Sequence, residues 1–96
     1  MKTVKFHPDA EAEMIAAAAY YEGQQPGLGR RFLASVQDAV NRIILNPHLY
    51  PIVELDVCRC IAKTFPFGVL FRKQPGRIVI MAVMHLRRDP NYWKNR

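Results

Sequence analysis

Long hydrophobic runs are missing from this chain of 96 residues, and their absence argues against a membrane-spanning helix. The apolar run at residues 78–84 is among the most hydrophobic stretches, yet no stretch approaches the ~20 residues that a membrane-spanning helix needs. The first residues are charged and run directly into helix-forming sequence, unlike a signal peptide. We therefore expect a cytoplasmic protein with no membrane partner.

Cysteine and histidine are also scarce, which argues against a disulfide framework and against a metal site. Cys58 and Cys60 are two residues apart on a predicted strand, so their side chains point the same way and do not easily bridge each other. The three histidines, His7, His48 and His85, are scattered. We expect two buried, reduced thiols, no metal and no cofactor.

Known catalytic motifs are absent as well. The chain has no glycine-rich phosphate loop, no nucleophile elbow, no zinc signature and no dinucleotide-binding fingerprint.

Acids are rare beyond residue 57, where nine cations stand against Asp89 alone and give a charge of +8, compared with −2 for residues 1–57. We expect the acids to lie in the helical half, apart from a basic sheet face. The asymmetry indicates an anionic partner or a solvated basic face.

Two amphipathic helices are the clearest elements that the sequence predicts. The first runs from about residue 10 to 22, after Pro8 and Asp9, and its many alanines allow a close approach of the second. The second carries apolar residues at helical spacing over 32–44 and ends at Asn46-Pro47. The glycine-rich break at 23–29 makes the pair an antiparallel helical hairpin.

The remaining elements are predicted strands. Residues 3–7 alternate in the manner of a short strand, and residues 48–56 are expected to be a connection. The last three strands should cover 57–63, 68–73 and 77–84, with a turn at Pro75-Gly76. The order β-α-α-β-β-β predicts one α+β domain over residues 1–96, in which a three-stranded antiparallel meander and the N-terminal strand form one sheet.

Several residues of the basic half are candidates for function. Arg59 lies between the two cysteines on the predicted strand. If the cysteines pack against the helices, Arg59 faces the opposite side of the sheet. His85 ends the apolar strand, where it is either a general acid/base or a structural histidine bonded to nearby backbone. Tyr92 and Trp93 could stack on bases, but packing of the tail back onto the sheet is favoured. Asp89 is placed to cap a final helical turn.

The motifs resemble the RelE/ParE superfamily of bacterial toxin–antitoxin toxins, and more closely its ParE branch of plasmid-stabilisation proteins. The similarity spans nearly the whole chain. It rests on Tyr20-Tyr21-Glu22, Pro26-Gly27-Leu28-Gly29 with Phe32-Leu33, Asn46-Pro47 with Tyr50-Pro51, Arg59, Phe65-Pro66-Phe67, and His85-x-x-Arg88-x-Pro90-x-Tyr92-Trp93-x-x-Arg96.

The resemblance implies a toxin that is neutralised by a cognate antitoxin. Such antitoxins have a DNA-binding N-terminal domain and an acidic, disordered C-terminal segment, which folds along the toxin's helical hairpin and sheet. The implied antitoxin contacts in this chain are Met14, Tyr21, Phe32, Val36 and Arg72.

Two activities divide the superfamily. RelE-like members are ribosome-dependent mRNA endonucleases, and in this chain Arg59, Arg88 and Tyr92 would be the catalytic residues. However, Gly68 and Ile61 stand where further cations are expected, and an incomplete set of cations weakens phosphoryl-transfer chemistry. A separate departure is that Phe67 and Phe71 stand where many relatives have tyrosine, which we expect to change the surface polarity and not the fold.

The ParE-like reading therefore leads, in which the toxin inhibits DNA gyrase by binding and not as an enzyme. A third possibility is a weakly toxic or inactive protein that only binds its antitoxin. The target-binding residues would be Arg59, His85, Arg87, Arg88, Tyr92, Trp93 and Arg96.

Overall fold

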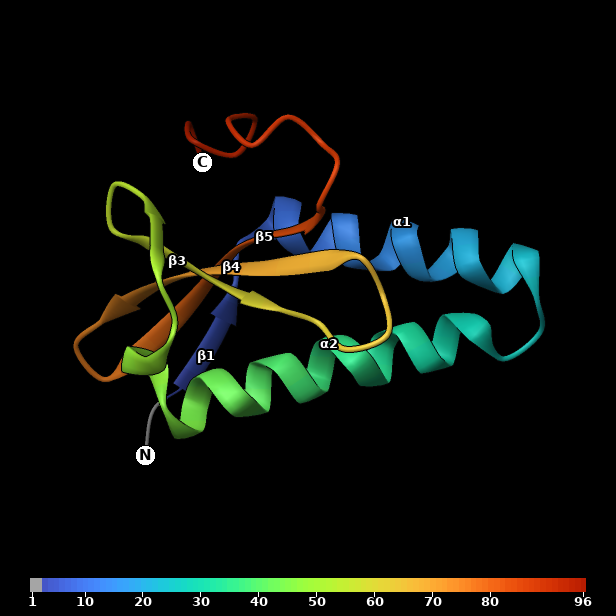
Figure 1. Cartoon of the computed structure of the whole chain (residues 1–96), viewed down its shortest axis with the longest axis horizontal. Coiled ribbons are helices and arrows are strands. Elements are labelled where there is room, and N and C mark those ends of the chain that lie inside the picture. The colour runs from blue at the N-terminus through green and yellow to red at the C-terminus, as the bar shows by residue number, and fades with distance from the viewer. Residues whose placement is uncertain (1–2) are drawn as a thin grey trace.

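One five-stranded sheet with two helices packed on one face forms the body of the protein (Figure 1). The structure is a computed structural model that describes residues 3–96. Its elements are β1 (Thr3–Phe6), α1 (Pro8–Gln24), α2 (Leu28–Leu45), a single 3₁₀ turn η1 (Pro47–Leu49), β2 (Ile52–Glu54), β3 (Val57–Ile61), β4 (Phe67–Gln74) and β5 (Arg77–His85). The predicted α+β class, the helical hairpin and the final meander are confirmed.

The helical hairpin is closed by one side chain, that of Glu22 near the end of α1. Its Oε2 accepts a hydrogen bond from Gly27 N–H at 2.9 Å, and its Oε1 accepts one from Gly29 N–H at 3.0 Å. These are N–H groups at the start of α2 that have no partner within the helix. Gly29 lies so close to α1 that a Cβ there would be 2.5 Å from the backbone oxygen of Ala18. The expected close approach of two helices with small residues is therefore present.

The sheet order is β1-β5-β4-β3-β2, and β1 is parallel to β5 while the other pairings are antiparallel. The expectation that residues 48–56 are only a connection is wrong, because they contain the edge strand β2 and the last two residues of η1. Ile52 pairs with Cys58 of β3, yet it is 63% exposed. A three-residue strand with outward side chains has no burial pattern that a sequence could show.

The sheet is covered on both faces, as expected for the apolar run in β5. Against the helices, Cys58 and Cys60 lie in a core with Phe32 and Phe71. On the other face, Trp93 from the C-terminal segment packs with Leu70 and other residues of a second, smaller cluster, and it is 2% exposed. Figure 1 shows this segment, in red, turning back after β5. The predicted packing of the tail onto the sheet is confirmed.

An irregularity in β5 makes this second cluster possible. Ala82 pairs with Leu70 of β4 but Ile80 pairs with Phe71, so Met81 is an extra residue. Met81 and Ala82 both contribute to the cluster under the tail, whereas strict alternation would place them on opposite faces. Within residues 3–96, no helix is long and apolar enough to cross a membrane.

Candidate functional site

Glu13 of α1 forms the centre of a cluster that joins α1, β5 and the C-terminal segment. Arg96 donates to Glu13 through two nitrogens, Nη1 to Oε1 at 2.7 Å and Nη2 to Oε2 at 3.1 Å. The two side chains are only 12% and 13% exposed. Two-point arginine–carboxylate contacts of this kind are among the stronger protein hydrogen bonds.

The same carboxylate satisfies the free edge of β5. β1 pairs with β5 only as far as Ile80, and beyond that point Glu13 Oε1 accepts a hydrogen bond from Val83 N–H at 3.2 Å. Arg96 Nη1 also donates to the carbonyl of Met81 at 3.1 Å. Since unpaired backbone groups at a strand edge invite other chains to pair, Glu13 and Arg96 cover this part of the edge.

Tyr92 lies against the guanidinium groups of two arginines. The Cζ atoms of Arg88 and Arg96 are 3.7 Å and 5.0 Å from the centre of its ring, and Arg88 Nη1 also contacts Glu13 Oε2 at 3.4 Å. Among the described residues the buried Tyr92 hydroxyl has no hydrogen-bond partner. Burial raises the pKa of Tyr92, and the neighbouring Glu13 carboxylate raises it further, so the phenol stays protonated. We call Glu13, Arg88, Tyr92 and Arg96 the Glu13 cluster.

The Glu13 cluster corrects one expectation about charge. We expected the acids to lie apart from the basic face, but Glu13 neutralises two of its arginines. Lys94 lies 3.4 Å from Glu54, and Arg72 lies 3.0 Å from Asp56. The composition gives the net charge, but acidic side chains neutralise much of the positive charge of the C-terminal half through ion pairs.

Arg59 points away from the helices, as predicted from the cysteines beside it. Its side chain runs along β4, where the Cδ would be 3.1 Å and the Cγ 3.2 Å from a Cβ at Gly68. A larger residue at position 68 would therefore push Arg59 aside. The missing cation at position 68 and the placement of Arg59 are linked, because the glycine provides the room that the arginine occupies.

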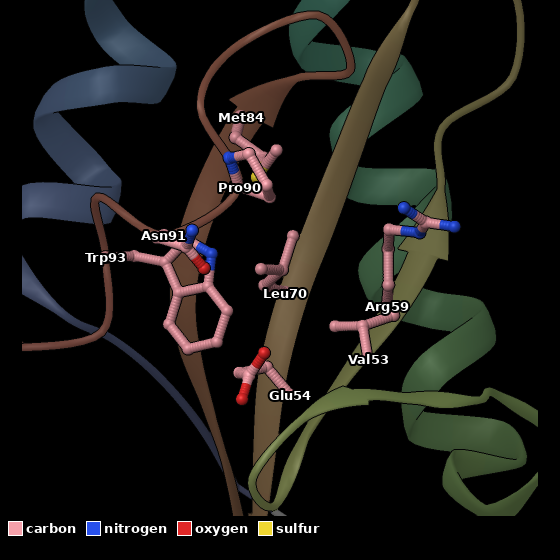
Figure 2. Close-up of a pocket in the computed structure, with 8 residues that line it drawn as sticks. All are labelled: Val53, Glu54, Arg59, Leu70, Met84, Pro90, Asn91 and Trp93. Carbon is pink, nitrogen blue, oxygen red and sulfur yellow. The ribbon is translucent and has the colours of Figure 1, made fainter.

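A pocket of about 200 Å³ separates Arg59 from the C-terminal segment. Figure 2 shows Trp93 and Asn91 on one side of Leu70, and Arg59 with Val53 on the other. We call it the Arg59 pocket; its lining residues are Val53, Glu54, Arg59, Leu70, Met84, Pro90, Asn91 and Trp93. Arg59 Nε and Trp93 Nε1 are buried and have no hydrogen-bond partner in residues 3–96.

His85 makes the backbone contact of a structural histidine, one of the two roles that the sequence left open. Its Nδ1 accepts a hydrogen bond from Arg87 N–H at 3.1 Å, and its ring packs edge-on against Phe67 at 5.2 Å between centroids. This holds the chain where it leaves β5, while the Arg87 side chain is exposed. Further along, Asp89 accepts from Asn91 N–H at 2.9 Å, which caps a series of turns and not the regular helical turn we expected.

The five expected antitoxin contacts do not lie together. Phe32 and Val36 are 0% and 1% exposed in the core, so in this conformation neither side chain is within reach of a partner, because α2 turns them toward the sheet. Met14 and Tyr21 are partly buried beside them. Arg72 pairs in register with Val57, which belongs to the cluster under the tail, so Arg72 lies on the opposite face of the sheet.

Sequence reasoning missed Glu13, Glu54 and the apolar lining of the Arg59 pocket. In the sequence Glu13 lies near the start of a helix, where an acidic residue is favourable whatever its tertiary contacts. It contacts Arg96 across 83 positions, a separation at which no local pattern exists. Among residues 3–96, no group of three or more histidine, cysteine, aspartate or glutamate side chains could hold a metal ion.

Comparison with known proteins gives one family and one fold. The family described as "ParE toxin of type II toxin-antitoxin system, parDE" matches residues 4–90. A solved structure titled "Chromosomal ParDE TA system from P. aeruginosa" is similar with a TM-score of 0.64 and 21% identity, over 88% of this chain and 96% of that one. At this identity the likeness shows a shared fold. A search of curated proteins found no match.

Proposed function

The chain belongs to the ParE toxin family of type II toxin–antitoxin systems, and on that premise we propose that it is a toxin that inhibits DNA gyrase by binding and is neutralised by a cognate antitoxin. Gyrase acts on DNA, so this function places the protein in the cytoplasm.

The observation that carries the choice of binding over catalysis is the Glu13 cluster. Two of the three residues that a RelE-like nuclease would use here, Arg88 and Tyr92, belong to it. Arg88 shares the Glu13 carboxylate with Arg96, and the Tyr92 hydroxyl is buried with its pKa raised. A phosphoryl-transfer site needs oriented, uncompensated donors and a group that exchanges a proton near neutral pH. A tyrosine kept protonated by burial and by a carboxylate does not suit that role.

We place the gyrase-binding surface on the sheet face that carries the Arg59 pocket. Arg59 has no ion-pair partner within the described residues 3–96, and Arg87 is exposed close by in sequence to the tail. Arginine beside apolar and aromatic side chains is the composition typical of binding hot spots. His85 and Trp93 support this surface from beneath, and the Glu13 cluster holds the tail that forms its rim.

The antitoxin surface is placed on the outer side of the helical hairpin. Three large apolar side chains are exposed there: Ile15 by 58%, Tyr20 by 64% and Leu33 by 40%. Scattered exposed apolar residues need no partner, but these three lie on the two helices that the resemblance assigns to the antitoxin. An acidic segment that folds on binding would cover them, with Met14 and Tyr21 at the edge of the contact.

A supercoiling assay with purified gyrase tests the proposal. The protein at micromolar excess should inhibit supercoiling or accumulate cleaved DNA, and Arg59→Met should weaken the effect about tenfold. Arg30→Met, an exposed cation on α2, is the matched control and should retain full effect. The absence of any effect of the wild-type protein would contradict the proposal.

The alternatives have their own outcomes. New 3′ ends in ribosome-bound message, seen by primer extension, would establish the nuclease instead. Unimpaired growth on expression without the antitoxin would favour a protein that only binds its partner. Induction with and without the neighbouring antitoxin gene, followed by the gyrase assay, separates these cases.

A further inference from the structure

The Arg59 pocket has the size and the lining of a site for a small organic molecule. Its volume is about 200 Å³, and an apolar cavity of ~150 Å³ is enough to hold benzene. Leu70 and Met84, buried residues of the cluster under the tail, and Pro90 provide apolar lining. The pocket therefore fits one aromatic ring or one branched aliphatic group with a short polar substituent.

Two buried donors in this lining require acceptors. Arg59 Nε and Trp93 Nε1 have no partner in residues 3–96, and Trp93 is 98% buried since only 2% of it is exposed. Buried polar groups without partners are rare in proteins, because each carries its full desolvation cost. A ligand that brings carboxylate oxygens to Arg59 would relieve this cost at the guanidinium.

The charge of the pocket favours an anion. The one carboxylate in the lining is Glu54, which is paired with Lys94 at 3.4 Å. Arg59 is the cation of the lining and takes part in none of the ion pairs of residues 3–96. Guanidinium groups bind carboxylates with strong, charge-assisted hydrogen bonds.

We propose that the Arg59 pocket binds small carboxylates that carry one apolar or aromatic group. The carboxylate lies at Arg59, and the apolar group lies on Leu70 and Met84 beside Trp93. This goes beyond gyrase inhibition, since it assigns a small-molecule site that needs neither gyrase nor antitoxin. A ligand of about ten non-hydrogen atoms should bind with a Kd on the order of 1 mM.

The test uses phenylacetate as the probe and the indole N–H resonance of Trp93 as the readout. Trp93 is the one tryptophan of the chain, so its indole signal in a ¹H–¹⁵N spectrum of the full-length protein is unambiguous. Phenylacetate should shift this signal saturably. Phenylacetamide, its neutral isostere, should bind about tenfold more weakly because it lacks the charge, and acetate alone should cause no saturable shift.

Three variants separate the parts of the proposal. Arg59→Met should bind phenylacetate and phenylacetamide equally, while Arg87→Met, which changes an exposed cation outside the lining, should keep the preference. Val53→Phe fills the pocket from a wall residue that is 38% exposed, so it should fold and bind neither probe. No saturable shift up to about 20 mM phenylacetate, or an unchanged preference in Arg59→Met, would overturn the proposal.

Discussion

The carboxylate of Glu13 and the guanidinium of Arg96 form a two-point ion pair, at 2.7 Å and 3.1 Å, that ties the last residue of the chain to the first helix. The pair covers the edge of β5 at Met81 and Val83, and the Arg96 guanidinium also lies against the Tyr92 ring. The C-terminal tail is thus positioned by an acid of α1.

Loss of the Glu13 carboxylate should destabilise the protein by about 2 kcal/mol, because Arg96, whose side chain is only 12% exposed, would remain without its counter-charge. Glu13→Gln tests this in urea unfolding, followed by the fluorescence of Trp93. The folded variant should also show a red-shifted Trp93 emission as the tail loosens. Asp38→Asn, which weakens the half-buried i,i+4 pair with Arg42 within α2, is the control and should cost no more than about 0.5 kcal/mol. Equal losses in both variants would refute the special role of Glu13.

Tyr92→Phe should leave both stability and gyrase inhibition nearly unchanged. The hydroxyl lies near the Glu13 carboxylate, which raises its pKa, but it makes no well-aligned hydrogen bond that the variant would lose, and the phenyl ring keeps its contact with Arg88. Tyr92→Leu removes that contact and should cost about 1 kcal/mol. Thermal unfolding and the supercoiling assay measure the two effects. A large loss of function in Tyr92→Phe with an intact fold would point instead to chemistry at the hydroxyl.

Gly29→Ala should destabilise the helical hairpin by roughly 1–3 kcal/mol. The added Cβ would lie 2.5 Å from the backbone oxygen of Ala18, so the two helices must move apart. Gly23→Ala, near the end of α1, is the matched control: nothing lies within 4 Å of its added Cβ, and it should be neutral or stabilising by about 0.5 kcal/mol. Chemical denaturation of the two variants measures the contrast, which would vanish if the helices were not in close contact.

The hairpin should weaken in acid through Glu22. Hydrogen bonds from Gly27 N–H, and then from Gly29 N–H, lower the pKa of Glu22 from its usual 4.5. Because the folded pKa lies below the unfolded one, this stabilisation is complete above about pH 4.5 and is lost as the pH falls through the folded value. An NMR titration of the Glu22 carboxyl measures the shift. Glu22→Gln should remove this part of the acid dependence, and a carboxyl that titrates at its usual pKa would exclude the two hydrogen bonds.

The helices could be predicted because their signals are local. Apolar residues at helical spacing in α2 and the Gly/Pro break before it depend only on neighbouring positions, and the structure differs from the prediction by a few residues at each end. β2 could not be predicted in this way, because its three residues are exposed and are ordered by pairing with β3. The bulge at Met81 could not be predicted either. A bulge is recognised in a sequence by an interruption in the alternation of apolar and polar residues, and residues 78–84 are all apolar.

The sequence by itself determined the α+β class, the family, and the direction in which Arg59 points, since each follows from periodicity, motif order or the alternation of a strand. Only the tertiary structure decided which of the many cations are neutralised and that Arg59 lines the pocket beside the tail. The physical reason is distance along the chain: Glu13 meets Arg96, and Glu54 meets Lys94, only after the tail has packed back over the sheet. Until then the tail is a cationic, aromatic segment whose partners cannot be read from its own residues.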